Sequence, residues 1–326
     1  MLIIVTYFEY PRYLAKLFKL RTGEELTLLK EWSFKSGDLS YKINKKKLKT
    51  FNQKIQWIKL YGITPLMRDC TDKVKVRDYV RERIGAEYLK PVLQVVRIEE
   101  SGVRSNNLNF SLSTLNSPLF DKIDFDKLPE SFVIKCNHGC KWHYIIKDKE
   151  EYLKNKRLVE ITRRNITGWL EQEFWIWGGF EMQYRGIKPK ILIEPLLRND
   201  INKNTEEIQI FCFSGIPKLI IRIEEGTDNK TTLYDEQLNI INDTFSPGDI
   251  NINRPKDNLI NKALVLSIKL TKYFNFVRVD WIVYKKEIYF EELTFTPFSG
   301  FHREINLKYN RYFGEITNLK ETNNEL

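Results

Sequence analysis

The sequence FVRVDWIVYKKEIYFEELT, residues 276–294, decides how this chain is expected to fold. Apolar and polar residues alternate along both halves of the stretch, which is the pattern of half-buried β-strands. Lys285-Lys286 separates the two halves, so we predict a hairpin with strands over residues 276–284 and 287–294.

Charged side chains on this hairpin are expected to face one another. Successive side chains of a strand point to opposite faces, so Arg278 and Asp280 share one face, as do Glu292 and Thr294 on the next strand. Adjacent carboxylates repel each other unless a cation lies between them, and Mg²⁺ binds a few carboxylates together with phosphate oxygens and water. The pattern predicts a magnesium and phosphate site in which Arg278 stabilises a transferred phosphoryl group. A surface ladder of opposite charges is the alternative.

The regions upstream of the hairpin mix helices and strands without a β-α-β repeat. Further strands are predicted over residues 92–96, 132–136, 144–147, 190–194, 208–213 and 218–223. The first sixty residues read as mainly helical, and further helices are predicted over 71–84, with Thr71 as N-cap, 150–177 and 255–274. This mixture predicts an α+β fold rather than a doubly wound sheet.

Length and charge limit the possible classes. The 326 residues suffice for two or three closely packed domains, and the 42% of hydrophobic residues favour a folded chain. The net charge of +10 favours an anionic partner, and an anionic polysaccharide precursor or a membrane surface fits it. The sequence has no zinc-finger or RNA-binding signature, so we do not expect a nucleic acid. No apolar segment reaches the roughly 20 residues that span a bilayer, and we expect a cytoplasmic protein, at most peripheral to the inner face of the membrane.

Two cysteines raise the alternative of a zinc site. Cys136 and Cys140 lie four residues apart, with His138 and His143 close by. No second close pair of cysteines completes the set of ligands, and Cys136 continues an apolar run that we expect to be a strand. Cysteine usage otherwise fits a reducing compartment.

Two other predicted strands end in a charged residue. Lys135 follows the apolar run 132–134, and burial of its ammonium is costly unless an anion compensates it. The turn 137–139 after it presents backbone N–H groups that suit a phosphate. Glu194 follows the apolar run 191–193 and suits hydrogen bonds with an adenine amino group or ribose hydroxyls. A charged residue at the end of a strand is commonly just solvated. The informative observation is therefore the order in which these features follow one another along the chain.

The motifs TDKVKVRDYV (residues 71–80), FVIKCNHG (132–139), VRVD (277–280) and ELTFTP (292–297) occur in this order. Together they resemble the TupA-like ATP-grasp proteins, a family associated with teichuronopeptide and capsular polysaccharide biosynthesis. The resemblance extends from about Ile58 to Phe313. It implies an ATP-grasp fold in three parts: an N-terminal mainly helical region (1–128), a lid subdomain that covers ATP (129–197) and a C-terminal catalytic domain that carries the metals (198–326).

The resemblance also implies a role for each candidate site residue. The residues implied to bind ATP are Lys73, Lys135, His138, Gly139, Glu194, Glu207 and Lys230, and those implied to bind Mg²⁺ are Asp280, Glu292 and Thr294. Lys73 and Lys135 would contact the phosphates, Glu194 the adenine and Glu207 the ribose. Arg278 would face the transferred phosphate, with Lys135 as the second catalytic residue.

The implied activity is that of an ATP-dependent carboxylate–amine ligase. A substrate carboxylate would attack the γ-phosphate of ATP to give an acyl phosphate and ADP, and an amine would then displace phosphate; an amino acid and a uronic acid are the expected pair. The alternatives are a glycosyltransferase of the same pathway and a catalytically inactive nucleotide-binding module. The second is motivated by departures from the family pattern: Trp142 in the lid loop, Gln209 in place of a basic residue, for which Lys230 would compensate, and Phe298 in place of glycine.

Overall fold

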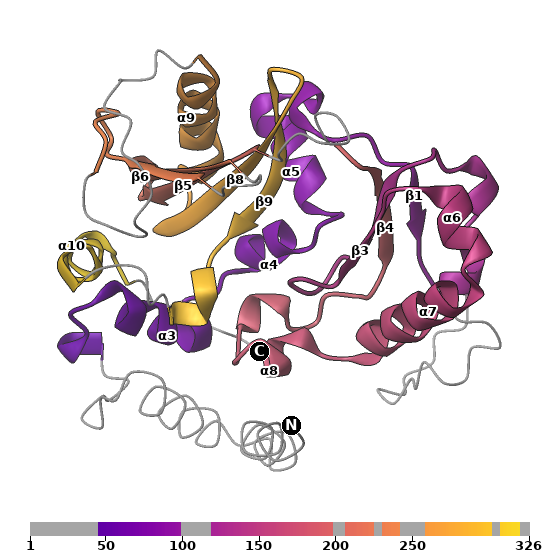
Figure 1. Cartoon of the computed structure of the whole chain (residues 1–326). Helices are drawn as coiled ribbons and strands as arrows, with labels where there is room; N and C mark the ends of the chain where they lie inside the picture. The colour runs from indigo at the N-terminus through magenta and orange to yellow at the C-terminus, as the bar shows by residue number, and fades with distance from the viewer. Residues whose placement is uncertain are drawn as a thin grey trace, which may run out of the picture.

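The computed structural model describes residues 45–98, 119–197, 206–224, 230–241, 258–301 and 307–319. These residues form two antiparallel sheets, each with its own hydrophobic core and its own helices (Figure 1). The predicted α+β class is confirmed. None of the helices in these ranges is long and apolar enough to cross a membrane.

The larger sheet contains the predicted hairpin of residues 276–294. Its strand order is β7-β6-β5-β8-β9, formed by β5 (Glu206–Phe213), β6 (Ile216–Glu224), β7 (Lys230–Tyr234), β8 (Phe276–Tyr284) and β9 (Glu287–Thr294). Helix α9 (Asn258–Thr271) covers one face, where the Trp281 indole Nε1 donates a hydrogen bond of 2.9 Å to Ser267 Oγ. Alternation along β8 therefore puts Arg278 and Asp280 on the opposite face.

The pairing of β8 with β9 contains one irregularity that matters for the site. Asp280 is paired with Glu292 and Trp281 with Phe290, so Glu291 is an extra residue without a partner in the register. Such a bulge bends the strand locally and changes where its side chains point. Alternation alone would assign Glu291 and Glu292 to opposite faces.

Helices from the N-terminal part pack on this larger sheet. They are α3 (Phe51–Tyr61), α4 (Pro65–Thr71) and α5 (Val76–Ile84), with α10 (Leu307–Ile316) beside α3. Thr50 starts α3 through a reciprocal pair of hydrogen bonds with Gln53, and the Phe51 ring packs against Phe213, Phe276 and Phe313. Residues 1–44 of the predicted helical region lie outside the described residues.

The predicted single helix over residues 71–84 is wrong. Thr71 is the last residue of α4, where its hydroxyl donates to the Met67 carbonyl oxygen at 2.7 Å, so it does not cap a following helix. The Asp72 carboxylate accepts hydrogen bonds from the backbone N–H groups of Val74 and Lys75, which turns the chain between the two helices. Helix α5 then ends at Gly85, as predicted, with φ of 110°.

The smaller sheet has the order β1-β4-β2-β3, with β1 (Gln94–Val96), β2 (Phe132–Cys136), β3 (His143–Ile146) and β4 (Ile191–Pro195). We call this sheet and its helices the lid. The helices are α6 (Lys149–Lys154), α7 (Lys156–Glu171) and α8 (Phe174–Trp177), which replace the single helix predicted over 150–177. Asn155 interrupts that helix because its side chain caps the backbone N–H of Leu158.

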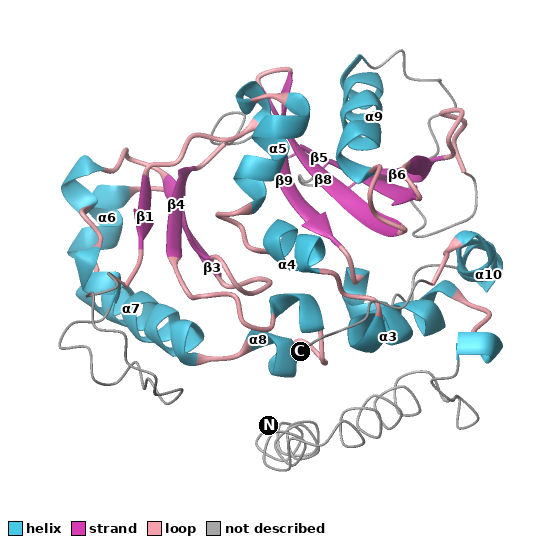
Figure 2. Ribbon diagram, turned by 180° about the vertical axis from the view of Figure 1, so that it is seen from behind, coloured by secondary structure: helices cyan, strands magenta, loops and turns pink. Residues whose placement is uncertain are grey.

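The lid core includes residues that the sequence analysis assigned to the N-terminal region. Strand β1 pairs with β4, and Leu119, Phe120 and Ile123 belong to the same hydrophobic cluster as β2. The predicted boundary at residue 129 therefore cuts through the lid core, because β1 lies at the edge of the sheet but early in the sequence. Seen from behind, α4 and α5 lie between the two sheets (Figure 2).

Candidate active site

Four side chains of the β8–β9 hairpin meet on the sheet face opposite α9. Arg278 donates from Nε to Asp280 Oδ1 at 2.7 Å and from Nη2 to Asp280 Oδ2 at 2.5 Å. The same Nη2 lies 3.5 Å from Glu292 Oε1 and 3.2 Å from Thr294 Oγ1, and the Thr294 hydroxyl donates to Glu292 Oε1 at 2.6 Å. The convergence predicted from alternation is thus confirmed, and we call these residues the hairpin cluster.

The hairpin cluster has more carboxylates than cations. Burial raises the pKa of Asp280 to about 7 against the charge and hydrogen bonds of Arg278, and Glu292 and Glu207 add to the rise. Asp280 and Glu292 share a single guanidinium, and a divalent cation would relieve their repulsion. Two carboxylates and a hydroxyl fit Mg²⁺, which takes its remaining ligands from phosphate and water. Within the described ranges no group of three or more His, Cys, Asp and Glu side chains is arranged around a metal position, at the cysteines or elsewhere.

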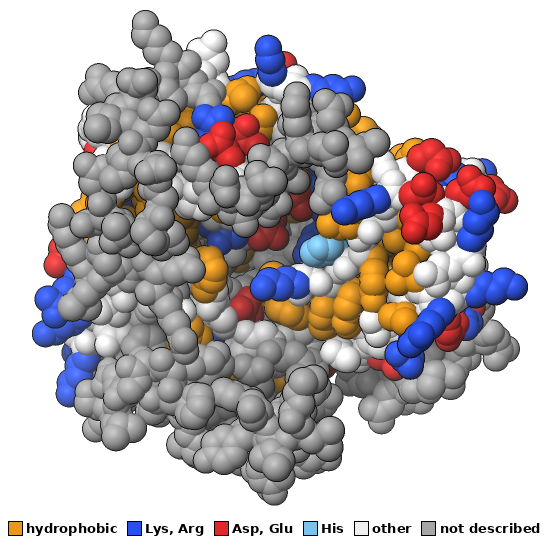
Figure 3. Space-filling model, in the orientation of Figure 1, with side chains coloured by type: hydrophobic (Ala, Val, Ile, Leu, Met, Phe, Trp, Pro, Cys, Tyr) orange, Lys and Arg blue, Asp and Glu red, His pale blue; other side chains and the backbone are white. Residues whose placement is uncertain are grey.

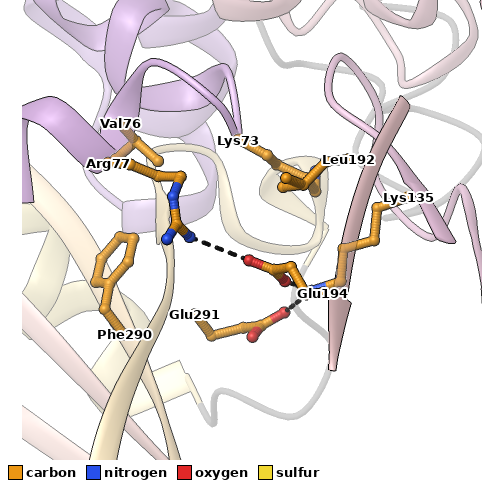
Figure 4. A pocket seen from close by; sticks show the side chains of 8 residues that line it. All are labelled: Lys73, Val76, Arg77, Lys135, Leu192, Glu194, Phe290 and Glu291. Atoms are coloured by element: carbon orange, nitrogen blue, oxygen red, sulfur yellow. Dashed lines mark hydrogen bonds and ion pairs between the residues drawn. The ribbon is translucent and has the colours of Figure 1, made fainter. Parts of the chain in front are cut away.

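A small pocket lies beside the hairpin cluster, between the lid and β9. Its walls are Lys73, Val76, Arg77, Lys135, Leu192, Glu194, Phe290 and Glu291 (Figure 4). On the surface, acidic and basic side chains gather in a hollow between the lid and the rest of the molecule, next to a histidine (Figure 3). Consecutive residues of β9 join the two parts of the site, since Glu291 lines the pocket and Glu292 belongs to the hairpin cluster.

Ion pairs in the pocket connect the lid with β9. Lys135 Nζ lies 3.0 Å from Glu194 Oε2 and 2.7 Å from Glu291 Oε1. The buried Lys90 ammonium lies 3.1 Å from Glu194 Oε2 and is also paired with Glu291, and Arg77 Nη1 lies 3.1 Å from Glu194 Oε1. Burial acts against each of these charges, but the lysines hold the pKa of Glu291 and that of Glu194 below their usual range, and the two carboxylates raise the pKa of Lys135.

The pocket has more cations than carboxylates. Lys73, Arg77, Lys90 and Lys135 are four cations around two carboxylates, which leaves a surplus of two positive charges. Lys73 Nζ donates to the Gly139 carbonyl oxygen at 2.6 Å and has no carboxylate partner among the described residues. Such a surplus in a mostly buried position favours an anionic ligand.

Asn137 fixes the turn between β2 and β3 beside Lys73. Its side chain donates to Asp72 Oδ1 and to the Lys188 carbonyl oxygen, both at 3.0 Å, and accepts from the Lys190 backbone N–H at 2.6 Å. The Asn137 carbonyl oxygen accepts from the Lys73 backbone N–H at 3.2 Å. The motif that begins at residue 71 and the motif that ends at residue 139 are therefore held together through buried polar contacts.

His138, one of the predicted ATP contacts, points into the lid. Its Nε2 lies 3.1 Å from the Trp169 carbonyl oxygen, and its Nδ1 is buried without a hydrogen-bond partner among the described residues. Burial lowers the pKa of His138 to about 4, so the ring is neutral. Its side chain is not among those that line the pocket.

The ring of Trp142 also packs inside the lid. It stacks on Trp169 with centroids 6.1 Å apart and meets Phe174 edge-on at 5.0 Å. It also covers Gly139, where an added Cβ would lie 2.3 Å from Trp142 Cε3. The bulk that departs from the family pattern is thus directed toward α7 and α8, and Trp142 does not line the pocket.

Three further residues of the sequence analysis lie on the larger sheet. Gln209 of β5 is paired with Asp280, and Glu207 is two positions along the same strand, so both are on the face of the hairpin cluster. Lys230 is the first residue of β7 and is paired with Glu224; only its backbone belongs to the described part. Glu207 is close enough to raise the pKa of Asp280, and it is not among the residues that line the pocket.

Phe298 lies beside the hairpin cluster in a turn with unusual backbone geometry. Phe298 and Ser299 have φ of 51° and 55°, in the left-handed region that favours glycine. The Phe298 ring is 55% exposed, and its centroid is 6.0 Å from Arg278 Cζ. The left-handed backbone explains why the family pattern has glycine at this position. This chain has an exposed aromatic ring there instead.

Polar side chains, most of them buried, hold that turn in place, and no pattern in the sequence points to them. The Lys59 ammonium, fully buried in α3, donates to Gln56 Oε1 at 3.0 Å, to the Ser299 carbonyl oxygen at 3.0 Å and to Ser299 Oγ at 2.9 Å. The Thr296 hydroxyl donates to Glu181 Oε2 at 3.0 Å. Burial raises the pKa of Glu181 to about 7, while the charge of Lys59 lowers it. We call these five residues the turn cluster.

Sequence reasoning also missed Arg77, Lys90 and Glu291. Arg77 lies inside the motif of residues 71–80, but helical spacing does not indicate that its side chain reaches Glu194 on β4. Lys90 follows a short helical turn with no periodic pattern, and it meets Glu291 across 201 residues of chain. The pair Glu291-Glu292 was the one available signal.

Comparisons with known proteins were made on this chain. The model of the TupA-like ATP-grasp family matches residues 53–318. A search of curated proteins finds no match. Among solved structures, D-alanine–D-alanine ligase from Bacillus anthracis complexed with ATP shares 17% identity and a TM-score of 0.35, over 69% of this chain and 53% of that chain. L-amino acid ligase from Bacillus licheniformis shares 11% identity and a TM-score of 0.44, over 92% and 63%.

The chain thus spans about half to two thirds of the length of these two enzymes. The family match includes all four sequence motifs, the walls of the pocket and the hairpin cluster. On the strength of that match, this chain belongs to the TupA-like ATP-grasp family.

Proposed function

We propose that the chain is an ATP-dependent carboxylate–amine ligase that acts through an acyl phosphate. The observation that carries the proposal is the opposition of charge along β9. Glu291 borders a pocket with surplus positive charge, and Glu292 belongs to a cluster with surplus negative charge. The polyphosphate of a nucleotide complements the first and a divalent cation complements the second.

The residues around the pocket suit the nucleotide. Lys73 and Lys135 would hold phosphate oxygens, with the backbone of Gly139 close to them. Val76, Leu192 and Phe290 give the apolar walls that an adenine ring needs. Glu194 already accepts from three cations, but each carboxylate oxygen has two lone pairs, so it retains capacity for an adenine amino group.

The hairpin cluster suits the transferred phosphate. Asp280 and Glu292, with Thr294 directly or through water, would hold Mg²⁺, which neutralises phosphate charge when it is bound. Arg278 is held in place by two hydrogen bonds to Asp280, so its guanidinium is oriented before any substrate arrives. Preorganised charge of this kind stabilises a transferring phosphoryl group. Glu207 and Lys230 stay predicted contacts to the ribose and the phosphates.

The proposed reaction has two steps. An oxygen of the substrate carboxylate attacks the γ-phosphorus as the bond from that phosphorus to the ADP oxygen breaks, which gives an acyl phosphate and ADP. The amine nitrogen of the second substrate then attacks the acyl carbon, phosphate leaves, and the amine loses a proton to give the amide. An amino acid and a uronic acid are the substrates that we propose, and the net charge of +10 favours such anionic compounds.

The test measures ADP release by the full chain with ATP, Mg²⁺ and a panel of uronic acids and amino acids. We expect release that depends on both a carboxylate and an amine, and Asp280→Asn should abolish it while thermal unfolding stays cooperative. Glu287→Gln is the matched control, because it removes one charge from β9 at an exposed pair with Lys262. Undiminished ADP release by Asp280→Asn would contradict the proposal.

A thermal-shift series separates the alternatives. An increase in Tm with ATP and Mg²⁺, together with ADP release, supports the ligase. An increase without ADP release under any substrate pair favours an inactive nucleotide-binding protein. Stabilisation by UDP-sugars but not by ATP would favour a glycosyltransferase.

A further inference from the structure

We propose that Glu291 is an internal counter-anion that occupies the phosphate-binding lysine Lys135 in the nucleotide-free protein, and that ATP must displace it to bind. This inference rests on the proposed function, in which Lys135 holds a phosphate. It goes beyond that function by identifying a residue that sets nucleotide affinity and a contact that links the two sides of the pocket.

The geometry distinguishes Glu291 from the other carboxylate in the pocket. Glu194 lies on β4, which is hydrogen-bonded to β2, so Glu194 and Lys135 belong to one sheet and move together. Glu291 lies on β9 of the other sheet, and its carboxylate is 2.7 Å from Lys135 Nζ. In Figure 4 the two side chains reach toward each other from opposite walls of the pocket. The Lys135–Glu291 ion pair therefore links the lid to the larger sheet.

The position of Glu291 conflicts with that of a bound nucleotide. The Glu291 carboxylate takes one of the three N–H donors of the Lys135 ammonium and repels a phosphate oxygen, which has the same sign of charge. The free volume inside the pocket is about 10 Å³, roughly enough for one water molecule and far below the roughly 300–1,000 Å³ of typical ligand sites. Withdrawal of Glu291 would leave Lys135 with Glu194 as its carboxylate partner, which makes room for a phosphate on the ammonium, and would separate the walls. The partner that remains for Glu291 is Lys90, which already shares it.

The bulge in β9 makes such a withdrawal possible. Glu291 has no partner in the register of β8 and β9, so its backbone is less constrained than that of Glu292 next to it. Glu291 is thus placed to leave Lys135 while Glu292 stays in the hairpin cluster. A local movement of one residue suffices, without a change in the pairing of the hairpin.

Binding of ATP with Mg²⁺ to the full chain, measured by isothermal titration calorimetry, tests this inference. Glu291→Gln keeps the shape of the side chain and removes the competing charge, so we expect the Kd to fall by on the order of ten-fold, within the range typical of couplings between sites. In the absence of nucleotide the same variant should have a lower Tm than the wild type, because Lys135 and Lys90 lose a partner. Glu287→Gln, on the same strand but in an exposed ion pair, should leave the Kd unchanged.

The opposite pair of results overturns the inference. If the wild type binds ATP and Glu291→Gln binds it equally well or more weakly, Glu291 does not compete with phosphate and serves only to stabilise the pocket. If neither protein binds ATP, the proposed function fails, and this inference fails with it. Should Glu291→Gln not fold, Glu291→Asp keeps the charge but withdraws it by one methylene, and a Kd at or above the wild-type value would then be the contradicting result.

Discussion

Replacement of Lys59 by methionine should destabilise the protein strongly although Lys59 lies outside the pocket and the hairpin cluster. Its ammonium is fully buried and makes three hydrogen bonds to Gln56 and Ser299. Methionine fills a similar volume but donates no hydrogen bond and carries no charge. The substitution therefore removes the donor to three acceptor atoms of the turn cluster and the positive charge that lowers the pKa of Glu181.

The expected loss follows from the cost of breaking a buried charged cluster. Removal of one partner from such a cluster typically costs about 3–5 kcal/mol, because the remaining polar groups stay buried. At about 1.5 °C per kcal/mol, from roughly 2.1 cal/mol/K of unfolding entropy per residue over 326 residues, Tm should fall by about 4–7 °C. Addition of Glu181→Gln to Lys59→Met removes the second charge and should recover about 1–3 kcal/mol, which is the coupling between the two sites.

Urea unfolding followed by tryptophan fluorescence gives the free energies for the double-mutant cycle. Lys262→Met is the matched control, since Lys262 forms an ion pair with Glu287 at the surface and its loss should cost about 0–1 kcal/mol. A loss below about 1 kcal/mol for Lys59→Met would refute the reasoning, because water would then have to replace the ammonium at no cost. A coupling of zero in the cycle would refute the link between Lys59 and Glu181.

Three further predictions concern buried side chains. Burial lowers the pKa of His138 to about 4, against about 6.5 in the unfolded chain, so the unfolded state binds more protons in between, and the His138 contribution to stability should fall by about 2 kcal/mol from pH 7 to pH 5. Asp280 and Glu181, whose pKa values burial raises to about 7, act in the opposite direction, so the His138 contribution is measured as the difference between the unfolding curves of the wild type and of His138→Gln. Gly139→Ala should cost about 1–3 kcal/mol by thermal unfolding because its Cβ meets Trp142, and an equal cost in a Trp142→Leu background would contradict that cause. Trp281→Phe should cost about 1–3 kcal/mol through the loss of the bond to Ser267, with a smaller cost when Ser267→Ala is also present.

The parts of the site that could be predicted are those governed by local periodicity. Strands β8 and β9 have the bounds expected from the alternation, and Arg278, Asp280, Glu292 and Thr294 meet as expected. The reason is that one face of this hairpin is buried under α9, which fixes the side on which every residue lies. The motifs then supplied the family, which the match over residues 53–318 confirms.

The missing parts depend on contacts that local patterns do not specify. Glu291 reaches the pocket because of a bulge, and alternation cannot predict where an extra residue is accommodated. Lys90 and the turn cluster join residues that are more than a hundred positions apart, and their selection depends on the packing of whole helices and sheets. The place of β1 depends on such packing too, since β1 joins a sheet whose other strands follow later in the chain.

Because Glu291 and Glu292 are adjacent, a movement of β9 can displace both of their carboxylates. One peptide unit, about 3.8 Å from Cα to Cα, separates the carboxylate that faces Lys135 from the one that faces Arg278. A shift of β9 along its own axis would move both carboxylates together. A rotation of the backbone at the bulge would move the Glu291 carboxylate alone. The kind of movement that β9 makes thus decides whether binding in the pocket also changes the geometry of the hairpin cluster.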